Sequence, residues 1–447
     1  MFGTSGIRGP VGDAVTAGLA LDVGRALGST GRDHVVVGRD PRESGEMLAD
    51  AVSAGARECG ANVTRLGVVS TPTLARSVSW LGADVGVAVT ASHNPPEDNG
   101  LKLWTPSGRA FDADQRRRVR QTVVGEQFAF ADWDDTGREF EWDGATERHR
   151  ERLVRAFPRL DGLSVAVDVG NGAGGLTVDA LDALGVDVVT LNAQRDGRFP
   201  GRPSEPAEEN CSDLVQFVSG SDVDFGIAHD GDADRMRAVT DEGEFVVGDV
   251  LVGLFARERV GKGDHVATPV DTSMVVDELV ADRGGEVERT QVGDVYVAAA
   301  VEGDDFVFGG EQSGTWIWPD ETLCPDASYA ACKLAAIVDQ RGPLSELLAD
   351  IETYPLRRTS IRTDERDAAM RAIESRLRDR YGLVDTTDGI RVQTENGWFL
   401  VRPSGTEPLV RVTVECRTAD AAEALFDDLV DTVEDVVSQV ATESISS

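Results

Sequence analysis

The sequence predicts an α/β protein with several doubly wound domains, and three observations support this class. Short valine-rich runs alternate along the chain with longer amphipathic stretches. Each run is followed by glycine or polar residues, as expected where a buried strand ends in a turn. The chain has 447 residues, more than a single hydrophobic core normally serves. We therefore expect parallel sheets with helices on both faces.

The predicted strands carry polar residues at their carboxyl ends. The strands are 35–37, 85–89, 165–167 and 223–227. Between them, segments such as 46–58 and 176–184 have apolar residues at spacings of three and four, which predicts helices. Ligands bind beyond the carboxyl ends of the strands in such sheets. Those ends carry Arg39-Asp40, Thr90 to His93, Asn171-Gly172 and Asp230 to Asp232.

Changes in this pattern divide the chain into four predicted domains. They are residues 1–146, 147–246, 247–356 and 357–447. The first boundary follows the acidic stretch 132–143. The second lies between a hairpin predicted at 240–244 and a helix that begins at Asp249. The last domain begins after Thr353-Tyr354-Pro355 and is predicted to combine a helix, strands and a closing helix.

The charge composition is strongly acidic and poor in lysine. The net charge is -35, and only three of the 44 basic residues are lysines. Such a surface resembles those of proteins from extreme halophiles, in which salt screens the repulsion between carboxylates. An acidic mesophilic protein is the alternative. In either case nucleic acid is not an expected partner.

From the sequence we expect neither a membrane span, nor a signal peptide, nor a disulfide framework. We find no uninterrupted apolar run approaching the ~18 residues that predict a membrane span. The amino terminus does not follow the pattern of a signal peptide, so we expect a cytoplasmic protein. The five cysteines are scattered and lack CxxC spacing, which argues against both a disulfide framework and a zinc site.

A candidate nucleophile follows the second predicted strand. Thr90-Ala91-Ser92-His93-Asn94-Pro95 is predicted to form a turn that holds the Ser92 hydroxyl toward solvent. Taken alone, such a turn is more often a helix cap or an Asx turn.

A candidate metal loop follows the fourth predicted strand. Asp230, Asp232 and Asp234 alternate with small residues, so one irregular loop can turn three carboxylates toward a hard cation such as Mg²⁺ or Ca²⁺. An EF-hand is ruled out because Arg235 occupies the position of the required glycine and no helix precedes the loop. A solvated acidic turn is the remaining alternative. The strand before the loop favours a metal site, because it directs the loop to the ligand-binding edge.

Two later segments could hold a phosphorylated sugar. Residues 309–314 combine a carboxylate, an amide and a hydroxyl on a glycine-bounded turn, which suits sugar hydroxyls but equally suits a plain turn. Residues 402–408 join a guanidinium to hydroxyls and glycine amides, a combination typical of phosphate binding. Arg411 could add charge there or form an ordinary surface ion pair.

A glycine-rich motif at 170–175 also satisfies GxGxxG between a strand and a helix. That pattern suggests a dinucleotide site, with Asp187 as the acidic residue further along. The spacing to Asp187 is loose and the motif is weak, so we do not favour this interpretation.

The motifs occur together in one order that resembles a known superfamily. They are Phe2 to Gly9, TASHNP at 90–95, DGDADR at 230–235, GEQSG at 310–314 and RPSGTEP at 402–408. In this combination the chain closely resembles the α-D-phosphohexomutase superfamily, and its composition resembles a halophilic archaeal member. The resemblance spans nearly the whole chain. It implies three related α/β domains and a smaller α+β carboxyl-terminal domain around a central cleft.

The resemblance also implies roles for individual residues. Ser92 corresponds to a phosphoserine that shares one Mg²⁺ with Asp230, Asp232 and Asp234. Arg8 and Lys102 correspond to positions beside the phosphoserine where charge stabilisation and proton transfer occur. Substrate contacts are implied for His93, Arg235, Gly293, Asp294, Glu311, Ser313, Arg402, Ser404, Gly405, Thr406 and Arg411.

The implied reaction interconverts hexose 1-phosphate and hexose 6-phosphate through a hexose 1,6-bisphosphate, which also serves as activator. GEQSG and the segment 98–102 favour phosphoglucosamine mutase, with phosphomannomutase or phosphoglucomutase as the alternative. Ser5, Val295 and Thr315 depart from common family residues, which bears on the substrate. Two other classes remain, a metal-dependent phosphatase and a non-catalytic sugar-phosphate sensor. A monomer and a homodimer are both compatible with the sequence.

Overall fold

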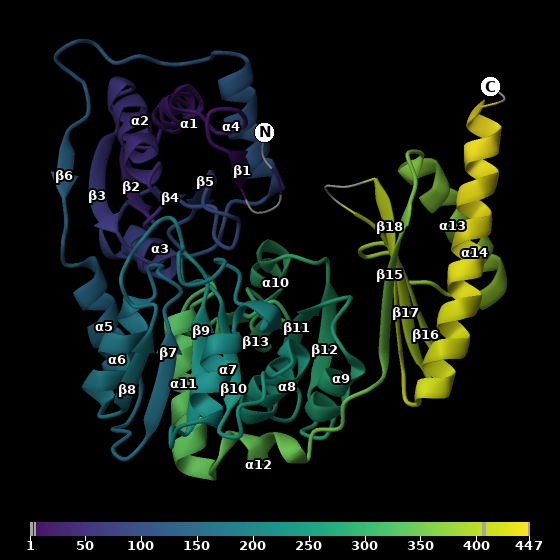
Figure 1. Ribbon diagram of the computed structural model, residues 1–447. Helices are drawn as coiled ribbons and strands as arrows, with labels where there is room; N and C mark the ends of the chain where they lie inside the picture. Colours follow the sequence, from purple (N-terminus) through teal and green to yellow (C-terminus); the bar gives the residue numbers. More distant parts are fainter. Residues whose placement is uncertain (1–2, 4–5, 405–407, 446–447) are drawn as a thin grey trace. The chain divides into compact units, whose positions relative to one another are not determined.

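The computed structural model describes Gly3, residues 6–404 and residues 408–445 (Figure 1). It contains two compact units. The first comprises residues 1–248, 293–304 and 308–350, and the second comprises residues 249–292, 305–307 and 351–447. Ser5, Gly405 and Thr406, which the sequence analysis singled out, lie outside the described residues.

The first unit begins with a six-stranded sheet. Its strands are β1 (Ile7–Pro10), β2 (His34–Arg39), β3 (Asn62–Val68), β4 (Val85–Val89), β5 (Asp98–Trp104) and β6 (Glu139–Glu141). Their order is β1-β5-β4-β2-β3-β6. β2, β3, β4 and β6 are parallel, whereas β5 is antiparallel to both β4 and β1. The expected parallel arrangement holds for these four strands but not for β5, because the connection over 90–97 is too short for a crossover helix.

Helices cover both faces of this sheet, as predicted. They are α1 (Ala17–Ser29), α2 (Gly45–Glu58), α3 (Thr71–Trp80) and α4 (Ala113–Val124). Val35 and Val37 of β2 belong to the core formed with α1, α2 and α4. Val36 belongs to a second core that contains Leu74 and Val78 of α3. This alternation follows from the two-residue period of a strand, and Figure 1 shows α3 on the opposite side of the sheet from α1 and α2.

A second sheet in the same unit has the order β10-β9-β7-β8. Its elements are β7 (Ser164–Asp168), β8 (Asp187–Leu191), β9 (Phe225–His229) and β10 (Met236–Thr240), with α5 (Ala145–Ala156), α6 (Gly175–Leu184), a 3₁₀ turn (Glu208–Asn210) and α7 (Ser212–Ser219). β7 is parallel to β8 and β9, and β10 returns antiparallel to β9 through the acidic loop. The predicted hairpin turn is confirmed, since the Thr240 amide donates to the Glu244 carbonyl at 2.8 Å.

The remaining elements of the first unit follow later in the chain. They are α10 (Asp294–Ala300), β13 (Phe306–Glu311), whose first two residues belong to the second unit, β14 (Thr315–Ile317), α11 (Ala327–Arg341) and α12 (Leu344–Ala349). β13 and β14 are antiparallel, and Glu311 faces Thr315 beside the turn between them. The turn carries the rest of the predicted sugar-binding motif.

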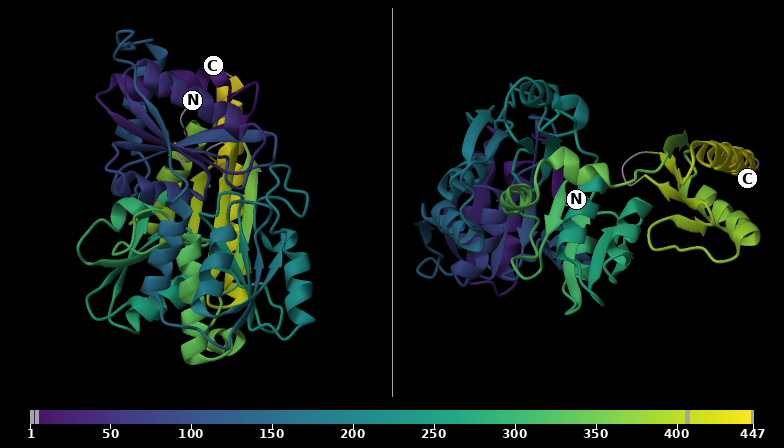
Figure 2. Two further views of the ribbon diagram at one scale, coloured as in Figure 1. Left: turned by 90° about the vertical axis from the view of Figure 1, so that its left-hand side faces the viewer. Right: turned by 90° about the horizontal axis from the view of Figure 1, so that it is seen from below.

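The second unit contains a parallel strand pair and an antiparallel sheet. Its elements are α8 (Gly248–Arg259), whose first residue belongs to the first unit, β11 (His265–Pro269), α9 (Met274–Ala281), β12 (Glu286–Thr290), β15 (Leu356–Arg362), α13 (Arg366–Tyr381), β16 (Ile390–Thr394), β17 (Gly397–Pro403), β18 (Leu409–Cys416) and α14 (Ala419–Ile445). β11 pairs with β12, and the antiparallel sheet has the order β15-β18-β17-β16. α13 and α14 pack on one face of that sheet (Figure 2).

These mixed sheets with flanking helices confirm the predicted α/β class, and the antiparallel carboxyl-terminal portion confirms the predicted α+β character there. Among the helices that the structure describes, none is long and apolar enough to cross a membrane.

Candidate active site

Ser92 lies in the turn after β4 and contacts the acidic loop. Its Oγ donates a hydrogen bond to Oδ2 of Asp230 at 2.7 Å, and its backbone is left-handed, with φ of 52°. Such a conformation is uncommon for serine and persists only where the surroundings enforce it. The residue is 1% exposed, so the prediction that its hydroxyl faces solvent is wrong. Ser92 is buried because the loop of the second sheet covers it.

Arg42, which was not predicted from the sequence, holds the Ser92 turn by hydrogen bonds to its carbonyl oxygens. Its guanidinium is fully buried and forms an ion pair with Asp40 at 3.0 Å. The same group donates to the carbonyl oxygens of Ser92 at 2.8 Å, Asn94 at 2.6 Å, Pro95 at 2.5 Å and Asp98 at 2.8 Å. Five donors in a planar fork make arginine suited to such a set of acceptors. In the sequence, Arg42 could have been recognised as a site residue by its position three residues after the end of β2.

The three aspartates form a buried carboxylate cluster between β9 and β10. One ligand oxygen from each of Asp230, Asp232 and Asp234 can be chosen so that all lie within 4.8 Å of one another. Burial, followed by the charges of the neighbouring aspartates, raises the pKa of Asp230 well above its usual value, and the same causes raise the pKa of Asp234 to about 6. Concentrated negative charge of this kind calls for a cation.

A test on individual atoms supports the fit of a metal ion. Oδ1 of Asp232 is buried and has no hydrogen-bond partner among the described residues. A buried carboxylate oxygen without a partner is costly unless a ligand satisfies it. The donor set consists of carboxylate oxygens, which Mg²⁺ prefers.

The glycine motif at 170–175 supports the acidic loop. The Ala173 amide donates to the Gly231 carbonyl at 2.9 Å. A Cβ atom at Gly172 would lie 2.7 Å from the same carbonyl oxygen, and one at Gly231 would lie 2.8 Å from the Ser92 carbonyl oxygen. Close backbone approach therefore accounts for these glycines without a nucleotide.

Positive charge surrounds the Ser92 hydroxyl. Lys102 is buried on β5, with Nζ 2.5 Å from Oδ2 of Asp294 and 3.7 Å from Oδ2 of Asp234. Burial alone would lower the pKa of Lys102, but the two carboxylates outweigh it and raise the pKa. Arg8 lies on β1 opposite Gly100, and its Nε is buried without a partner among the described residues. The Arg235 amide donates to Oδ1 of Asp230 at 3.1 Å.

The pKa of His93 reflects this positive charge. Its Nδ1 lies 3.3 Å from Oγ of Ser92. Arg235, followed by burial and then by Arg8, Arg42 and Lys102, lowers the pKa of His93 to about 2. The imidazole is therefore neutral at physiological pH and can exchange hydrogen bonds without adding charge.

We expect the His93 imidazole of the metal-free, unphosphorylated protein to stay neutral down to about pH 4. Arg235→Gln removes the largest cause of the shift, so it should raise the His93 pKa toward its ordinary value. Histidine NMR can follow this, because the chain has five histidines. His34, whose pKa is lowered mainly by burial, serves as the control and should not respond. A His93 signal that titrates equally in both proteins would contradict the prediction.

The predicted sugar-binding residues meet in the same unit. The Gly293 amide donates to Oε1 of Glu311 at 2.7 Å, and Ser313 Oγ donates to Oε2 of Glu311 at 3.1 Å. Asp294, next to Gly293, is the partner of Lys102. These contacts link the GEQSG turn to the charged residues beside Ser92. Val295 is buried in the core rather than directed at a ligand.

The predicted phosphate-binding residues of the carboxyl-terminal sheet lie in the second unit. Arg402 of β17 faces Arg411 of β18 across the ladder, and Nη1 of Arg402 donates to Oδ2 of Asp388 at 2.9 Å. The Ser404 carbonyl accepts a hydrogen bond from Arg366 at 2.5 Å. Like charges directly opposite in a ladder are unfavourable unless an anion offsets them, and Asp388 offsets Arg402 here. Two guanidinium groups on one face of the sheet are also suited to an anionic ligand.

Comparison with known proteins places the chain in a family. Models of the phosphoglucomutase/phosphomannomutase family match it in sequence order: α/β/α domain I at residues 1–130, domain II at 149–243, domain III at 247–354 and the carboxyl-terminal domain at 359–432. A "Probable phosphoglucosamine mutase" from Methanopyrus kandleri is 46% identical over 448 residues, which cover 98% of this chain and 99% of the relative. The chain belongs to this family. It is a phosphohexomutase, an isomerase that acts by intramolecular phosphotransfer.

Other comparisons agree with this membership. A protein of the same name from Methanosarcina acetivorans is 46% identical over 422 residues, 93% of this chain and 95% of the relative. The crystal structure of a phosphoglucomutase/phosphomannomutase family protein from Burkholderia thailandensis has a TM-score of 0.87 at 30% identity and covers 97% of each chain. N-acetylphosphoglucosamine mutase from Aspergillus fumigatus, solved with GlcNAc-6P and magnesium, shares the fold of this phosphohexomutase at 17% identity, with a TM-score of 0.62 and coverage of 98% of this chain and 96% of that one.

Proposed function

We propose that this phosphohexomutase interconverts glucosamine 6-phosphate and glucosamine 1-phosphate through a phosphate carried on Ser92. The observation that carries the proposal is the 2.7 Å hydrogen bond from Ser92 Oγ to Asp230, a member of a buried cluster of three carboxylates. A hydroxyl in that position can carry a phosphoryl group beside a divalent ion. Phosphoryl transfer relies on positioning and charge neutralisation. The hydrogen bond positions the Ser92 hydroxyl, and a divalent ion in the carboxylate cluster would neutralise charge.

Asp230, Asp232 and Asp234 would hold one Mg²⁺ together with the seryl phosphate. When bound, the ion would supply charge neutralisation to the phosphoryl group in transfer. The assignment is supported by the crowded carboxylates and by Oδ1 of Asp232, which no described residue contacts by a hydrogen bond. A metal site of this kind also accounts for the loop's burial, since three ionised aspartates would otherwise repel one another.

Lys102 and Arg8 supply fixed positive charge beside Ser92. Lys102 has a raised pKa, so it remains an ammonium ion at physiological pH and can stabilise negative charge on the transferred group. Its bond to Asp294 limits its side-chain freedom. Both residues are buried or partly buried, where charge acts more strongly than in water. Because both side chains keep their protons, they stabilise charge and can donate a proton to a leaving oxygen, and Lys102 would have to lose its own proton before it could accept one from the substrate hydroxyl.

Glu311 and Ser313 would contact sugar hydroxyls, and Arg402, Ser404 and Arg411 would contact the phosphate that does not react. A carboxylate accepts hydrogen bonds from two hydroxyls, and paired guanidinium groups suit a dianion. The hexose 1,6-bisphosphate intermediate would reorient between the two transfers, so each phosphate occupies each position once. His93, Arg235, Gly293 and Asp294 complete the proposed substrate contacts.

Glucosamine phosphate is favoured because the relatives at 46% identity carry the name phosphoglucosamine mutase. A coupled assay tests this with glucosamine, mannose and glucose phosphates in turn, at high salt and with a trace of hexose bisphosphate. We expect glucosamine phosphate to give the highest kcat/KM. EDTA should abolish turnover and Mg²⁺ should restore it, because the carboxylate cluster lacks a cation after chelation.

The assay separates the alternatives. Faster turnover of mannose or glucose phosphate would reassign the substrate within the family. Release of inorganic phosphate as the main product would indicate a phosphatase. Absence of turnover for every sugar, together with absence of phosphate on Ser92, would indicate a sugar-phosphate sensor and refute the proposed function.

A further inference from the structure

Thr71 contacts the acidic loop at two points. It is the first residue of α3, and its amide donates to the Asp232 carbonyl oxygen at 2.9 Å. Its hydroxyl donates to Oδ2 of Asp232 at 2.5 Å. Both residues are buried. A carboxylate oxygen can only accept here, so the threonine hydroxyl is the donor and the bond has one direction.

The two oxygens of the Asp232 carboxylate therefore differ. Oδ2 is bound by Thr71, whereas Oδ1 is buried and has no partner among the described residues. A carboxylate can rotate about its Cβ–Cγ bond and exchange its oxygens unless a neighbour prevents it. The threonine bond supplies that restraint and leaves Oδ1 for another ligand.

We propose that Thr71 is a positioning residue of the metal centre, which holds Oδ2 of Asp232 so that Oδ1 is presented to the divalent ion. This inference rests on the proposed function, because it takes the aspartate cluster as the metal site. Thr71 itself does not contact the ion. Partners behind metal ligands orient them, and their loss costs about 10- to 100-fold in metal affinity or activity.

A buried polar network holds the residues of α3 on either side of Thr71. Ser70 caps α3, and its hydroxyl lies 2.8 Å from that of Thr73. Thr73 Oγ1 lies 2.9 Å from Nδ1 of His149, whose Nε2 lies 3.0 Å from Oδ2 of Asp326. Arg76, one turn further along α3, donates to the same Asp326 oxygen at 2.9 Å and 3.0 Å. The first turns of α3 are thus held by a charged cluster.

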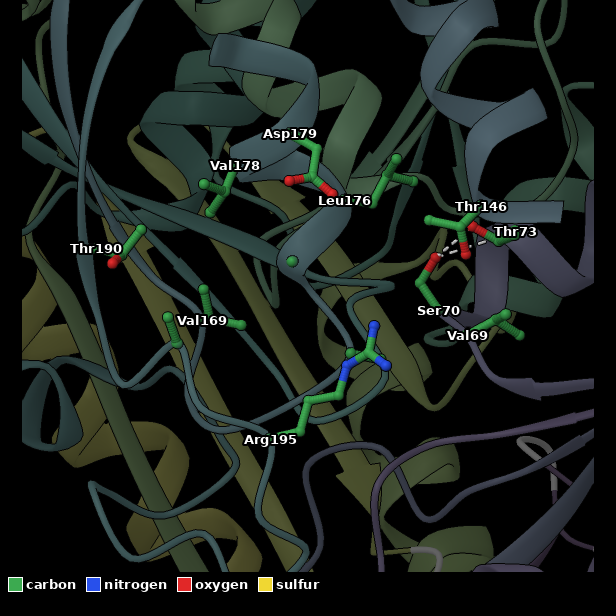
Figure 3. A pocket seen from close by; sticks show the side chains of 13 residues that line it. Val69, Ser70, Thr73, Thr146, Val169, Leu176, Val178, Asp179, Thr190 and Arg195 are labelled. Atoms are coloured by element: carbon green, nitrogen blue, oxygen red, sulfur yellow. Dashed lines mark hydrogen bonds between the residues drawn. The ribbon is translucent and has the colours of Figure 1, made fainter. Parts of the chain in front are cut away.

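Packing and directional bonds together hold this turn. Residues 71–78 of α3 are all buried. On one side, a pocket of about 280 Å³ that is partly open to solvent adjoins Ser70 and Thr73 and extends toward Thr146, Leu176 and Arg195 (Figure 3). On that side the hydrogen bonds of Ser70 and Thr73 help to set the position of the turn, and with it the position of the Thr71 hydroxyl.

Calorimetric titration of the full-length, metal-free protein with Mg²⁺ tests the proposal. Thr71→Val keeps the side-chain shape but removes the donor, and should weaken Mg²⁺ binding by about tenfold or more. Thr71→Ser retains the hydroxyl and should bind within about threefold of the parent protein. Thr71→Ala provides a second variant without the donor should the valine variant fold poorly.

Thr177→Val is the matched control. Thr177 is a buried threonine of α6 whose hydroxyl lies 2.9 Å from that of Ser328, so its partner is not a residue of the acidic loop. It should lose thermal stability to a similar extent as Thr71→Val but keep its Mg²⁺ affinity. In turnover assays, excess Mg²⁺ should restore much of the kcat of Thr71→Val, whereas a loss due to general destabilisation would not respond to Mg²⁺.

Two outcomes would overturn the inference while leaving the metal centre in place. One is unchanged Mg²⁺ affinity in Thr71→Val and Thr71→Ala, and the other is equal weakening in these variants and in Thr177→Val. If the parent protein itself bound no Mg²⁺, the proposed metal centre would fail first, and the role of Thr71 would fail with it.

Discussion

Ser92→Ala is expected to abolish turnover while leaving the fold intact. Removing Oγ eliminates the proposed phosphate carrier, and loss of a nucleophile lowers kcat by about 10⁴-fold or more in enzymes that use one. The folded state loses the hydrogen bond to Asp230 and the longer contact with His93, each worth about 1 kcal/mol. Alanine meets the same left-handed backbone requirement as serine, so no further strain arises.

Initial rates, mass spectrometry of the peptide containing residue 92, and circular dichroism measure this result together. The variant should carry no phosphate at position 92 and keep the parent spectrum. Ser53→Ala is a suitable control, because Ser53 is a buried α2 serine that donates only to the Ala49 carbonyl in its own helix. It should retain parental kcat. Full activity in Ser92→Ala would refute the proposed mechanism.

Among the variants proposed here, Arg42→Met is expected to lower the free energy of unfolding the most. Methionine fills similar space but leaves four carbonyl oxygens of the Ser92 turn without their donor. It also leaves the Asp40 carboxylate buried without its counter-charge. Removal of one member of a buried ion pair costs about 3–5 kcal/mol in unfolding free energy. Activity should fall as well, because the turn that positions Ser92 loses its support.

The loss should depend on pH through Asp40. Burial already raises the pKa of Asp40 to about 6, and Arg42 opposes that shift. Without Arg42 the folded-state pKa rises further above the unfolded value. Folding then disfavours the ionised carboxylate, so the destabilisation is smallest in acid and grows as pH rises through the folded pKa. Urea denaturation at acidic and alkaline pH should show this trend.

Two further variants make the Arg42 experiment specific. Arg42→Met with Asp40→Asn removes the uncompensated charge and should recover part of the lost stability and most of the pH dependence. Arg198→Met breaks an exposed ion pair with Glu43 close to the same loop in sequence and should leave the unfolding midpoint unchanged. Equal destabilisation by Arg42→Met and Arg198→Met would contradict the importance assigned to the buried arginine.

The predicted elements were accurate where short-range patterns decide structure. Segments 46–58 and 176–184 are helical to within one residue at their starts, and 85–89 forms β4. Hydrophobic periodicity encodes such elements locally. Neither β5 nor its direction was predicted, because the pairing of this segment depends on how the chain leaves the Ser92 turn. That path is set by tertiary contacts rather than by the composition of the strand.

The candidate site was predicted in its chemical groups but not in its environment. Ser92 and Asp230 are 138 positions apart, yet both were chosen because each follows a predicted strand. Sequence placed the Ser92 hydroxyl in solvent, whereas the fold buries it under the acidic loop. Arg42 and Thr71 escaped notice because their acceptors are backbone carbonyls and one oxygen of a distant carboxylate. The spacing of residues within one segment does not predict hydrogen bonds to such acceptors.

By itself, the sequence determined the α/β class, the serine and the three aspartates that we propose carry the chemistry, and the positions of these residues at strand ends. Those features depend on side-chain type and on periodicities that operate within a few residues. Tertiary structure alone decided that the serine is buried, that Arg42 supports its turn, and that one oxygen of Asp232 has no partner in the part of the chain that the structure describes. Burial and hydrogen-bond direction arise only when separate segments pack together, so they are absent from any local pattern.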